Sequence, residues 1–525
     1  MLPKHITFFS TGLLSIIGSG VTAQPKPNIL IIVTDDLGYS DPGCFGGDIP
    51  TPNIDRLAAE GMRMLNFYTY PVSAPTRASL MTGLYPTRAG VGRMGLRTDV
   101  PEYGDHLRVD CTTIAENLKN NGYATFLSGK WHLGDRDGER PAQRGFDRSY
   151  SMLVGSDDYY RPSTLCVDDH PVKPDDPDYY ITHHFTDNAV NYIKESGDKP
   201  FFLYLAYTAP HWPLQAPKEE ADKYIEFYMQ GWDVLRQTRF EQQKAMGIIP
   251  PQTVLPPRDH RVPEWNSLNE TDKISWAQKM SIYAAMVNIV DQGIGKVLKT
   301  LEDRKILDNP IIMFLSDNGG CPWPSRSFVS GAPADADAQT PGSSIYYNFH
   351  WAQVSTTPHY SYKRFAYDGG VNVPFIVRYP RDVKSGAFST VRAHVIDILP
   401  TCLDYTATKL LTSFRGNKTQ GNLDGVSLRS VFAGSNQPIH DILAWEHNGE
   451  RGLLKGDWKI VWNRADKIEA WQLFDLNRDG GVELNDQSGN YPEKLKELVK
   501  EYENWAKLNK VLTPEEVEKL PKLPQ

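Results

Sequence analysis

Five short and continuously apolar runs constrain the fold of this 525-residue chain more than any other feature. Such runs are typical of parallel strands buried on both faces, whereas a strand with one wet face alternates apolar and polar residues. The runs are residues 29–33, 123–127, 201–207, 311–315 and 375–379. Helical patterns lie between them, so we expect an α/β protein with a mostly parallel sheet sandwiched by helices.

Helix signals between the runs support this alternation. Thr51 and Pro52 predict the start of a helix that Gly61 ends. A second helix is expected over residues 113–122. A third is expected over about residues 274–301, where apolar side chains recur on one face.

Two regions depart from this rhythm. Residues 219–268 carry paired prolines and many charges, and we interpret them as an insertion packed over the core. From about residue 439, short apolar runs predict a small antiparallel sheet followed by a helix. We therefore predict a main α/β domain at residues 24–438 and a C-terminal subdomain at residues 439–525.

The first 23 residues have the pattern of an export signal. Lys4 and His5 precede an apolar segment, and small residues ending in Ala23 suit a cleavage site. A membrane anchor is the alternative, but the segment is short and interrupted by serine, threonine and glycine. We expect cleavage after Ala23 and an exported protein, periplasmic or secreted, that does not span a membrane.

Polar side chains follow four of the five runs, at the carboxyl ends of the expected strands. They are Asp35 and Asp36, Lys130 and His132, His211, and Asp317 and Asn318. Ligands bind beyond the carboxyl ends of strands in open α/β folds, so we expect these residues to meet. The aspartates and the asparagine offer only oxygen ligands, which favour a hard cation such as calcium or magnesium over zinc. The alternative is unrelated acidic turns.

The most specific motif is residues 73–83, Ser-Ala-Pro-Thr-Arg-Ala-Ser-Leu-Met-Thr-Gly. On structural grounds alone, Ser73 could cap a helix, with Pro75 in the first turn and Gly83 at its end. The N-terminus of a helix also attracts anions. The capping role and an anion-binding role are compatible.

The same motif resembles the signature of the type I sulfatases, in which a serine or cysteine followed by x-Pro-x-Arg is oxidised to formylglycine. The likeness continues in family order through Gly-Lys-Trp-His-Leu-Gly at 129–134, Thr-Ala-Pro-His-Trp-Pro at 208–213 and Lys-Arg-Phe-Ala-Tyr-Asp-Gly-Gly-Val at 363–371. The family usually has Glu-Gly-Gly where this chain has Asp368 before two glycines. The resemblance spans Asn28 to about Trp505 and implies an alkaline-phosphatase-like fold and an arylsulfatase-like sulfuric ester hydrolase.

The resemblance also implies a catalytic cycle. One hydroxyl of the hydrated aldehyde attacks sulfur, and the other then expels sulfate, whereas an unmodified serine would form a stable ester. Arg77 and Lys130 would stabilise the hydrated aldehyde. His132 would take the proton that triggers expulsion. Lys363 and His211 would contact the sulfate and the leaving oxygen, with His211 as general acid. One calcium ion would be held by Asp35, Asp36, Ser73 in its oxidised form, Asp317 and Asn318.

Substrate and partners are less constrained. Export favours an exo-acting sulfatase of sulfated carbohydrates, with aryl sulfates as surrogate substrates. Residues that could hold the sugar are Asp157, Asp158, Tyr159 and Trp323, although ordinary loop polarity explains them equally well. In the family that the chain resembles, a serine at the position of Ser73 implies a bacterial host with an anaerobic radical-type maturation enzyme. A formal net charge of −8 argues against nucleic-acid binding.

Two other functions remain open. One is a phosphonate or phosphate monoester hydrolase of the same superfamily. The other is a catalytically silent glycan-binding relative, in which Ser73 stays unoxidised.

Overall fold

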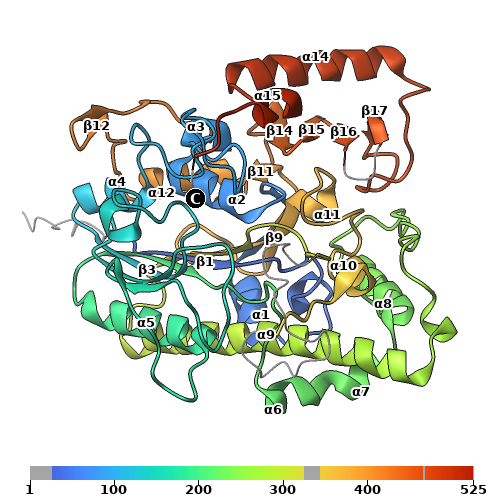
Figure 1. Ribbon diagram of the computed structural model, residues 1–525, viewed down its shortest axis with the longest axis horizontal. Helices are drawn as coiled ribbons and strands as arrows, with labels where there is room; N and C mark the ends of the chain where they lie inside the picture. Colours follow the sequence, from blue (N-terminus) through green and yellow to red (C-terminus); the bar gives the residue numbers. More distant parts are fainter. Residues whose placement is uncertain (1–25, 324–342, 465–467, 524–525) are drawn as a thin grey trace, which may run out of the picture.

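The computed structural model describes residues 26–323, 343–464 and 468–523, so the predicted signal peptide at residues 1–23 lies outside it. Within this part, an 11-stranded sheet runs in the order β10-β2-β9-β8-β1-β7-β3-β4-β5-β6, with β11 beside β2. Helices cover both faces of the sheet (Figure 1). The α/β fold class with a mostly parallel sheet is therefore confirmed.

The centre of the sheet is parallel. Its strands are β8 (Ile311–Ser316), β1 (Ile29–Thr34), β7 (Phe201–Ala206), β3 (Ala124–Lys130) and β4 (Arg148–Met152). All residues of β1, β7 and β8 are buried, which explains their continuous apolar sequence. Successive side chains of β1 enter different cores, because Leu30 and Ile32 face one side of the sheet and Ile31 and Val33 face the other.

One strand direction was predicted wrongly. Residues 375–379 fall in β9 (Asn372–Arg378), which runs antiparallel to β8 and to β2 (Met62–Tyr68). A strand buried on both faces is apolar whatever the direction of its neighbours, so the run of side chains could not reveal this. The remaining strands of the sheet are β5 (Leu165–Val167), β6 (His170–Pro171), β10 (Ala387–Ser389) and β11 (Ala393–His394).

The helices form two layers (Figure 1). Those on one face are α1 (Pro52–Glu60), α5 (Ile181–Glu195) and α9 (Glu270–Asp303). Those on the other are α2 (Ser73–Thr82), α3 (Pro86–Ala89), α4 (Ile114–Asn120) and α12 (Ile398–Tyr405). The three helices expected from the sequence are α1, α4 and α9. Thr113 and Glu116 close a capping box at the start of α4.

The insertion at residues 219–268 packs on the helix layer beside the sheet. Its helices are α6 (Lys218–Ala221), α7 (Ile225–Tyr228) and α8 (Trp232–Ala245). They lie along α9 and α10 (Asn348–Ser355). Trp232 meets Trp351 of α10 edge to face at 5.6 Å, and both indoles belong to the same core as β1. The insertion thus adds to an existing core.

The C-terminal region forms the expected antiparallel sheet and helix. The strands β14 (Ile442–His447), β15 (Glu450–Lys455), β16 (Trp458–Asn463) and β17 (Ile468–Asp475) pair in sequence order. Helix α14 (Pro492–Leu508) packs across them, and α15 (Pro514–Glu518) follows. The Trp445 indole donates to the Thr69 carbonyl at 2.8 Å, which joins this sheet to the main one. A boundary at residue 439 stays a prediction.

In the described ranges, no helix is both long enough and apolar enough to cross a membrane.

Candidate active site

The polar strand ends meet at one edge of the central sheet. Strands β1 and β8 are neighbours in register, with Thr34 opposite Ser316, so the residues that follow each strand lie side by side. The side-chain amide of Asn318 donates from Nδ2 to Asp36 Oδ1 at 2.7 Å, and the backbone N–H of Asp36 donates to Asp317 Oδ1 at 3.4 Å. Strands β3 and β7 bring Lys130 and His211 to the same edge. The expectation that these strand ends converge is confirmed.

Ser73 lies in the first turn of α2 and faces this cluster. Its hydroxyl is 3.0 Å from Asp35 Oδ1 and 3.4 Å from Asn318 Oδ1, and the residue is 1% exposed. The residue that caps the helix is Val72, and Gly83 closes it in the left-handed conformation. The Ser73 side chain therefore serves the cluster of carboxylates and does not cap α2.

Arg77 lies one turn further along α2 and is fully buried. Its Nε and Nη2 atoms donate to Asp317 Oδ2 at 3.0 and 2.8 Å, and Nη1 donates to the Lys130 carbonyl at 3.2 Å. A second carboxylate, that of Asp35, lies 3.5 Å from Nη2. The guanidinium is thus held rigidly beside Ser73 by charged partners.

Two lysines complete the ring of positive charge. Lys130 Nζ is 2.5 Å from Asp35 Oδ2, and Lys363 Nζ pairs with Asp36 Oδ1. Lys363 comes from the loop before α11 (Asp368–Val371), far from Lys130 in the sequence. Three carboxylates and three cations therefore share one buried site.

Burial and charge shift the carboxylates in opposite directions. Burial would raise the pKa of Asp35, but the charges of Lys130, Arg77 and Lys363 hold this pKa well below its usual range. The pKa of Asp317 is raised to about 6, first by burial and then by the charge of Asp35. The Asp317 carboxylate is therefore harder to ionise than that of Asp35, and a bound cation would favour its ionised form.

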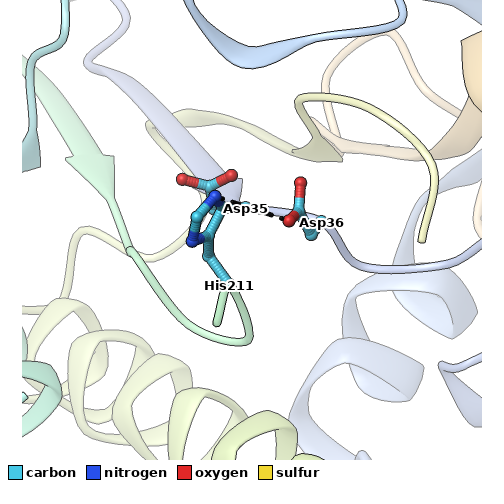
Figure 2. Close-up of side chains that lie close together, drawn as sticks. All are labelled: Asp35, Asp36 and His211. Carbon is cyan, nitrogen blue, oxygen red and sulfur yellow. Dashed lines mark ion pairs between the residues drawn. The ribbon is translucent and has the colours of Figure 1, made fainter. Parts of the chain in front are cut away.

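The donor set fits a hard cation. Asp35, Asp36 and His211 each present a ligand atom, and these atoms lie within 4.8 Å of one another (Figure 2). The buried Asp36 Oδ2 has no hydrogen-bond partner among the described residues, although His211 Nε2 lies 3.6 Å away. Carboxylate and amide oxygens dominate the surroundings of Ser73. This chemistry suits calcium better than zinc.

Both histidines are held neutral. Burial lowers the pKa of His211 to about 4, and its Nδ1 donates to the Trp212 carbonyl at 2.5 Å, so Nε2 faces the pocket. Burial, followed by the charges of Lys130 and Arg77, lowers the pKa of His132 well below its usual value. Within the described part of the chain, His132 Nδ1 has no hydrogen-bond partner. The ring is therefore neutral and free to accept a proton, although the two nearby cations oppose its charged form.

The residues expected to hold the sugar are mostly engaged within the protein. The Asp157 carboxylate accepts from the Ser163 and Thr164 amides, and the Asp158 carboxylate accepts from the Tyr160 and Arg161 amides and from Gln215. These bonds fold the loop at residues 157–164, and contact of both carboxylates with substrate stays a prediction.

Tyr159 and Trp323 differ from this pair of aspartates. The buried Tyr159 hydroxyl donates to the His211 carbonyl at 2.8 Å, so it supports a predicted catalytic residue. Trp323 is half-buried, with the Arg364 guanidinium 5.2 Å from its ring centroid. Of the four residues, Trp323 retains an accessible aromatic surface.

Tyr204 is a member of the site that the sequence did not indicate. Its hydroxyl accepts from Arg77 Nη1 at 3.4 Å. Tyr204 lies inside the apolar run of β7, where an aromatic side chain is expected to be an ordinary core residue. Only the packing of α2 over the sheet gives its hydroxyl a role.

Known proteins match this chain over most of its length. Residues 27–408 match the family described as Sulfatase. An uncharacterized sulfatase of Schizosaccharomyces pombe is 36% identical, over 90% of this chain and 92% of its own length. An arylsulfatase of Klebsiella aerogenes is 33% identical, over 74% and 88%. The crystal structure of Ps i-CgsB with k-i-k-neocarrahexaose has a TM-score of 0.68 at 28% identity, covering 93% and 94%.

Proposed function

Because this chain belongs to the sulfatase family of sulfuric ester hydrolases, we propose that it releases inorganic sulfate with a formylglycine made from Ser73 and one calcium ion. The position of Ser73 carries the proposal. Its oxygen lies 3.0 Å from Asp35 in a buried site that also holds Arg77, Lys130 and Lys363. Burying so many charged groups together contributes little to stability, whereas such clusters are common at active sites.

The proposed mechanism needs two groups that the encoded chain does not itself supply, a calcium ion and a formylglycine. Calcium would be held by Asp35, Asp36, Asp317, Asn318 and the side chain at position 73, and would polarise the sulfate oxygens and stabilise their negative charge. Formylglycine, once hydrated, supplies the oxygen that attacks sulfur and the hydroxyl that permits release.

The lysines and the arginine bind and orient the sulfate. Lys130 approaches the carboxylates from the end of β3 and Lys363 from the loop before α11, so their ammonium groups can hold separate sulfate oxygens. Arg77, fixed by Asp317, donates on the side of Ser73. Donors fixed before substrate arrives stabilise the charge that develops on oxygen without further reorganisation.

The histidines move protons. His132, which burial and two nearby cations keep neutral at rest, is free to accept a proton from the hydroxyl at position 73, and an anionic sulfate bound nearby would favour the imidazolium that results. His211 would first take up a proton at Nε2 when the sulfate ester binds and would then donate it to the leaving oxygen. Its pKa of about 4 rises when an anionic sulfate binds beside it, since a nearby negative charge favours the imidazolium.

We assign sulfated carbohydrates as the substrate class. The enzyme would act in exo fashion, removing sulfate from the end of the sugar chain, and aryl sulfates would serve as surrogate substrates. The support is a structural relative crystallised with a neocarrahexaose and a relative named arylsulfatase. The half-buried ring of Trp323 supplies a surface for a sugar face. The first 23 residues support export to the periplasm or beyond, and the serine at position 73 supports maturation by an anaerobic radical-type enzyme.

Sulfate release from an aryl sulfate, an aryl phosphate with the same leaving group, and a panel of sulfated monosaccharides tests the proposal. We expect the sulfate esters to be hydrolysed fastest and Ser73→Ala to be inactive. Ser79→Ala, a change in the same buried helix, should stay active. Faster turnover of the phosphate would support a phosphate monoester hydrolase, and sugar binding without turnover would support a silent glycan-binding protein.

A further inference from the structure

A second buried charge cluster lies where the C-terminal sheet meets the main domain. Lys459 of β16 has a fully buried side chain and pairs with Asp368 Oδ1, while its Nζ donates to Glu483 Oε1 at 2.7 Å. The Asp368 amide donates to the same Glu483 oxygen at 2.8 Å. The cluster therefore ties β16 and the segment after β17 to the first residue of α11.

Stability alone is a poor explanation for this cluster. Removing a lysine and two carboxylates from water costs several kcal/mol per ion, and apolar residues of the same volume are often equally stable. Burial opposes both charges, yet the pKa of Asp368 is lowered by Lys459, and the pKa of Lys459 is raised by Asp368 and Glu483. The pair is charged, and its geometry is defined.

The turn that Asp368 begins packs tightly, backbone against backbone, on the loop that carries Asn318 and on the loop that carries Lys363. The Gly319 amide donates to the Gly370 carbonyl at 3.1 Å, and the Gly369 amide donates to the Tyr360 carbonyl at 2.9 Å. A Cβ on Gly319 would lie 1.8 Å from the Gly369 carbonyl oxygen. Backbone therefore meets backbone at distances that only glycine permits.

These contacts reach the sulfate pocket directly. Gly319 follows Asp317 and Asn318, and the Lys363 amide donates to the Gly320 carbonyl at 3.1 Å. A displacement of the turn at Asp368 must therefore move the loop that carries Lys363, the loop that carries Asn318, or both.

We propose that Lys459 is a positioning residue for the sulfate pocket, which acts through Asp368 on Lys363 and on the Asp317–Asn318 pair. The proposal rests on the function proposed above and extends it to the C-terminal sheet. It also accounts for Asp368, where sulfatases usually have glutamate. The shorter carboxylate still reaches Lys459, and Glu483 supplies a second carboxylate and accepts from the Asp368 amide.

The variant Lys459→Met tests this, because it keeps the length of the side chain and removes its charge. We expect kcat/KM for an aryl sulfate to fall about tenfold or more, since small displacements of catalytic groups have large effects on rate. Amide hydrogen exchange should speed up in peptides covering residues 317–320 and 360–371. Lys459→Arg should restore part of both properties.

Arg144→Met is the matched control. Arg144 forms a buried pair with Glu116 at 2.8 Å that does not contact the sulfate pocket. We expect this variant to lose stability while keeping kcat/KM within about twofold of wild type and exchange unchanged in the two peptides, because surface and core pairs away from a site act on folding alone.

A folded Lys459→Met protein with wild-type kcat/KM and unchanged exchange would overturn the proposal. If Lys459→Met does not fold, Asp368→Asn, which preserves size, takes its place, and wild-type behaviour there has the same meaning. Hydrogen exchange does not depend on turnover. An inactive wild-type protein would thus refute the proposed function, while the exchange data would still decide the role of Lys459.

Discussion

Replacing Tyr159 with phenylalanine should separate the stability of the fold from the position of His211. The Tyr159 hydroxyl is buried and donates to the His211 carbonyl at 2.8 Å. The substitution removes one oxygen atom and leaves the ring, which packs against Tyr180, unchanged in shape. The His211 carbonyl then loses the donor that fixes it.

The expected magnitudes follow from this one bond. Leaving a buried carbonyl without its donor costs about 1–3 kcal/mol of unfolding free energy. A displacement of a catalytic group by about 1 Å can lower a rate about 100-fold, so we expect kcat to fall between about tenfold and 100-fold with KM nearly unchanged. Tyr180→Phe is the control, because the Tyr180 hydroxyl donates to the Gln215 carbonyl, also at 2.8 Å and also buried.

Urea unfolding followed by circular dichroism measures the unfolding free energy, and sulfate release from an aryl sulfate measures kcat and KM. Both variants should lose similar stability, and only Tyr159→Phe should lose kcat. Equal kcat for the two variants would refute the positioning of His211 by Tyr159. A rise in KM alone would instead indicate that Tyr159 contacts the substrate.

Three further predictions concern the metal site and pH. Asp317→Ala removes a proposed calcium ligand and leaves the buried Arg77 with only the more distant Asp35 carboxylate, so calorimetry should show weaker calcium binding, and unfolding free energy should fall by about 3 kcal/mol. Strong chelation should abolish sulfate release by the wild-type protein, and unchanged release would contradict a calcium role. Burial raises the pKa of Glu446 from 4.5 to about 7, so the native state holds this proton more tightly than the unfolded chain. The contribution of Glu446 to stability should therefore be fully present below pH 4.5 and be lost, at a cost of about 3 kcal/mol, as pH rises through 7, so in urea titrations the unfolding free energy of the wild type should fall over this range relative to that of Glu446→Gln.

The layered fold could be predicted because strands buried on both faces consist of continuous runs of apolar residues. The direction of β9 could not, because burial is the same for either direction. Strand β2, with its polar Arg63 and Asn66, did not form such a run and was not predicted. Sequence patterns thus indicate which strands are buried but not which strands are neighbours or in which direction they run.

The same contrast holds in the site. The strand-end residues and Ser73 could be found because each lies in a recognisable local motif. Tyr204 and Lys459 carry no local signal, since a tyrosine in an apolar strand and a lysine in a C-terminal strand are ordinary residues. Their importance comes from contacts with residues far away in the chain, which only the folded structure specifies.

The mass of the peptide that contains Ser73, taken from protein that hydrolyses sulfate esters, tests the central claim most directly. We predict a peptide lighter by two hydrogen atoms than the encoded sequence, in a proportion that tracks specific activity across preparations. Full activity in protein whose Ser73 peptide has only the encoded mass would contradict the claim that an oxidised Ser73 is the nucleophile.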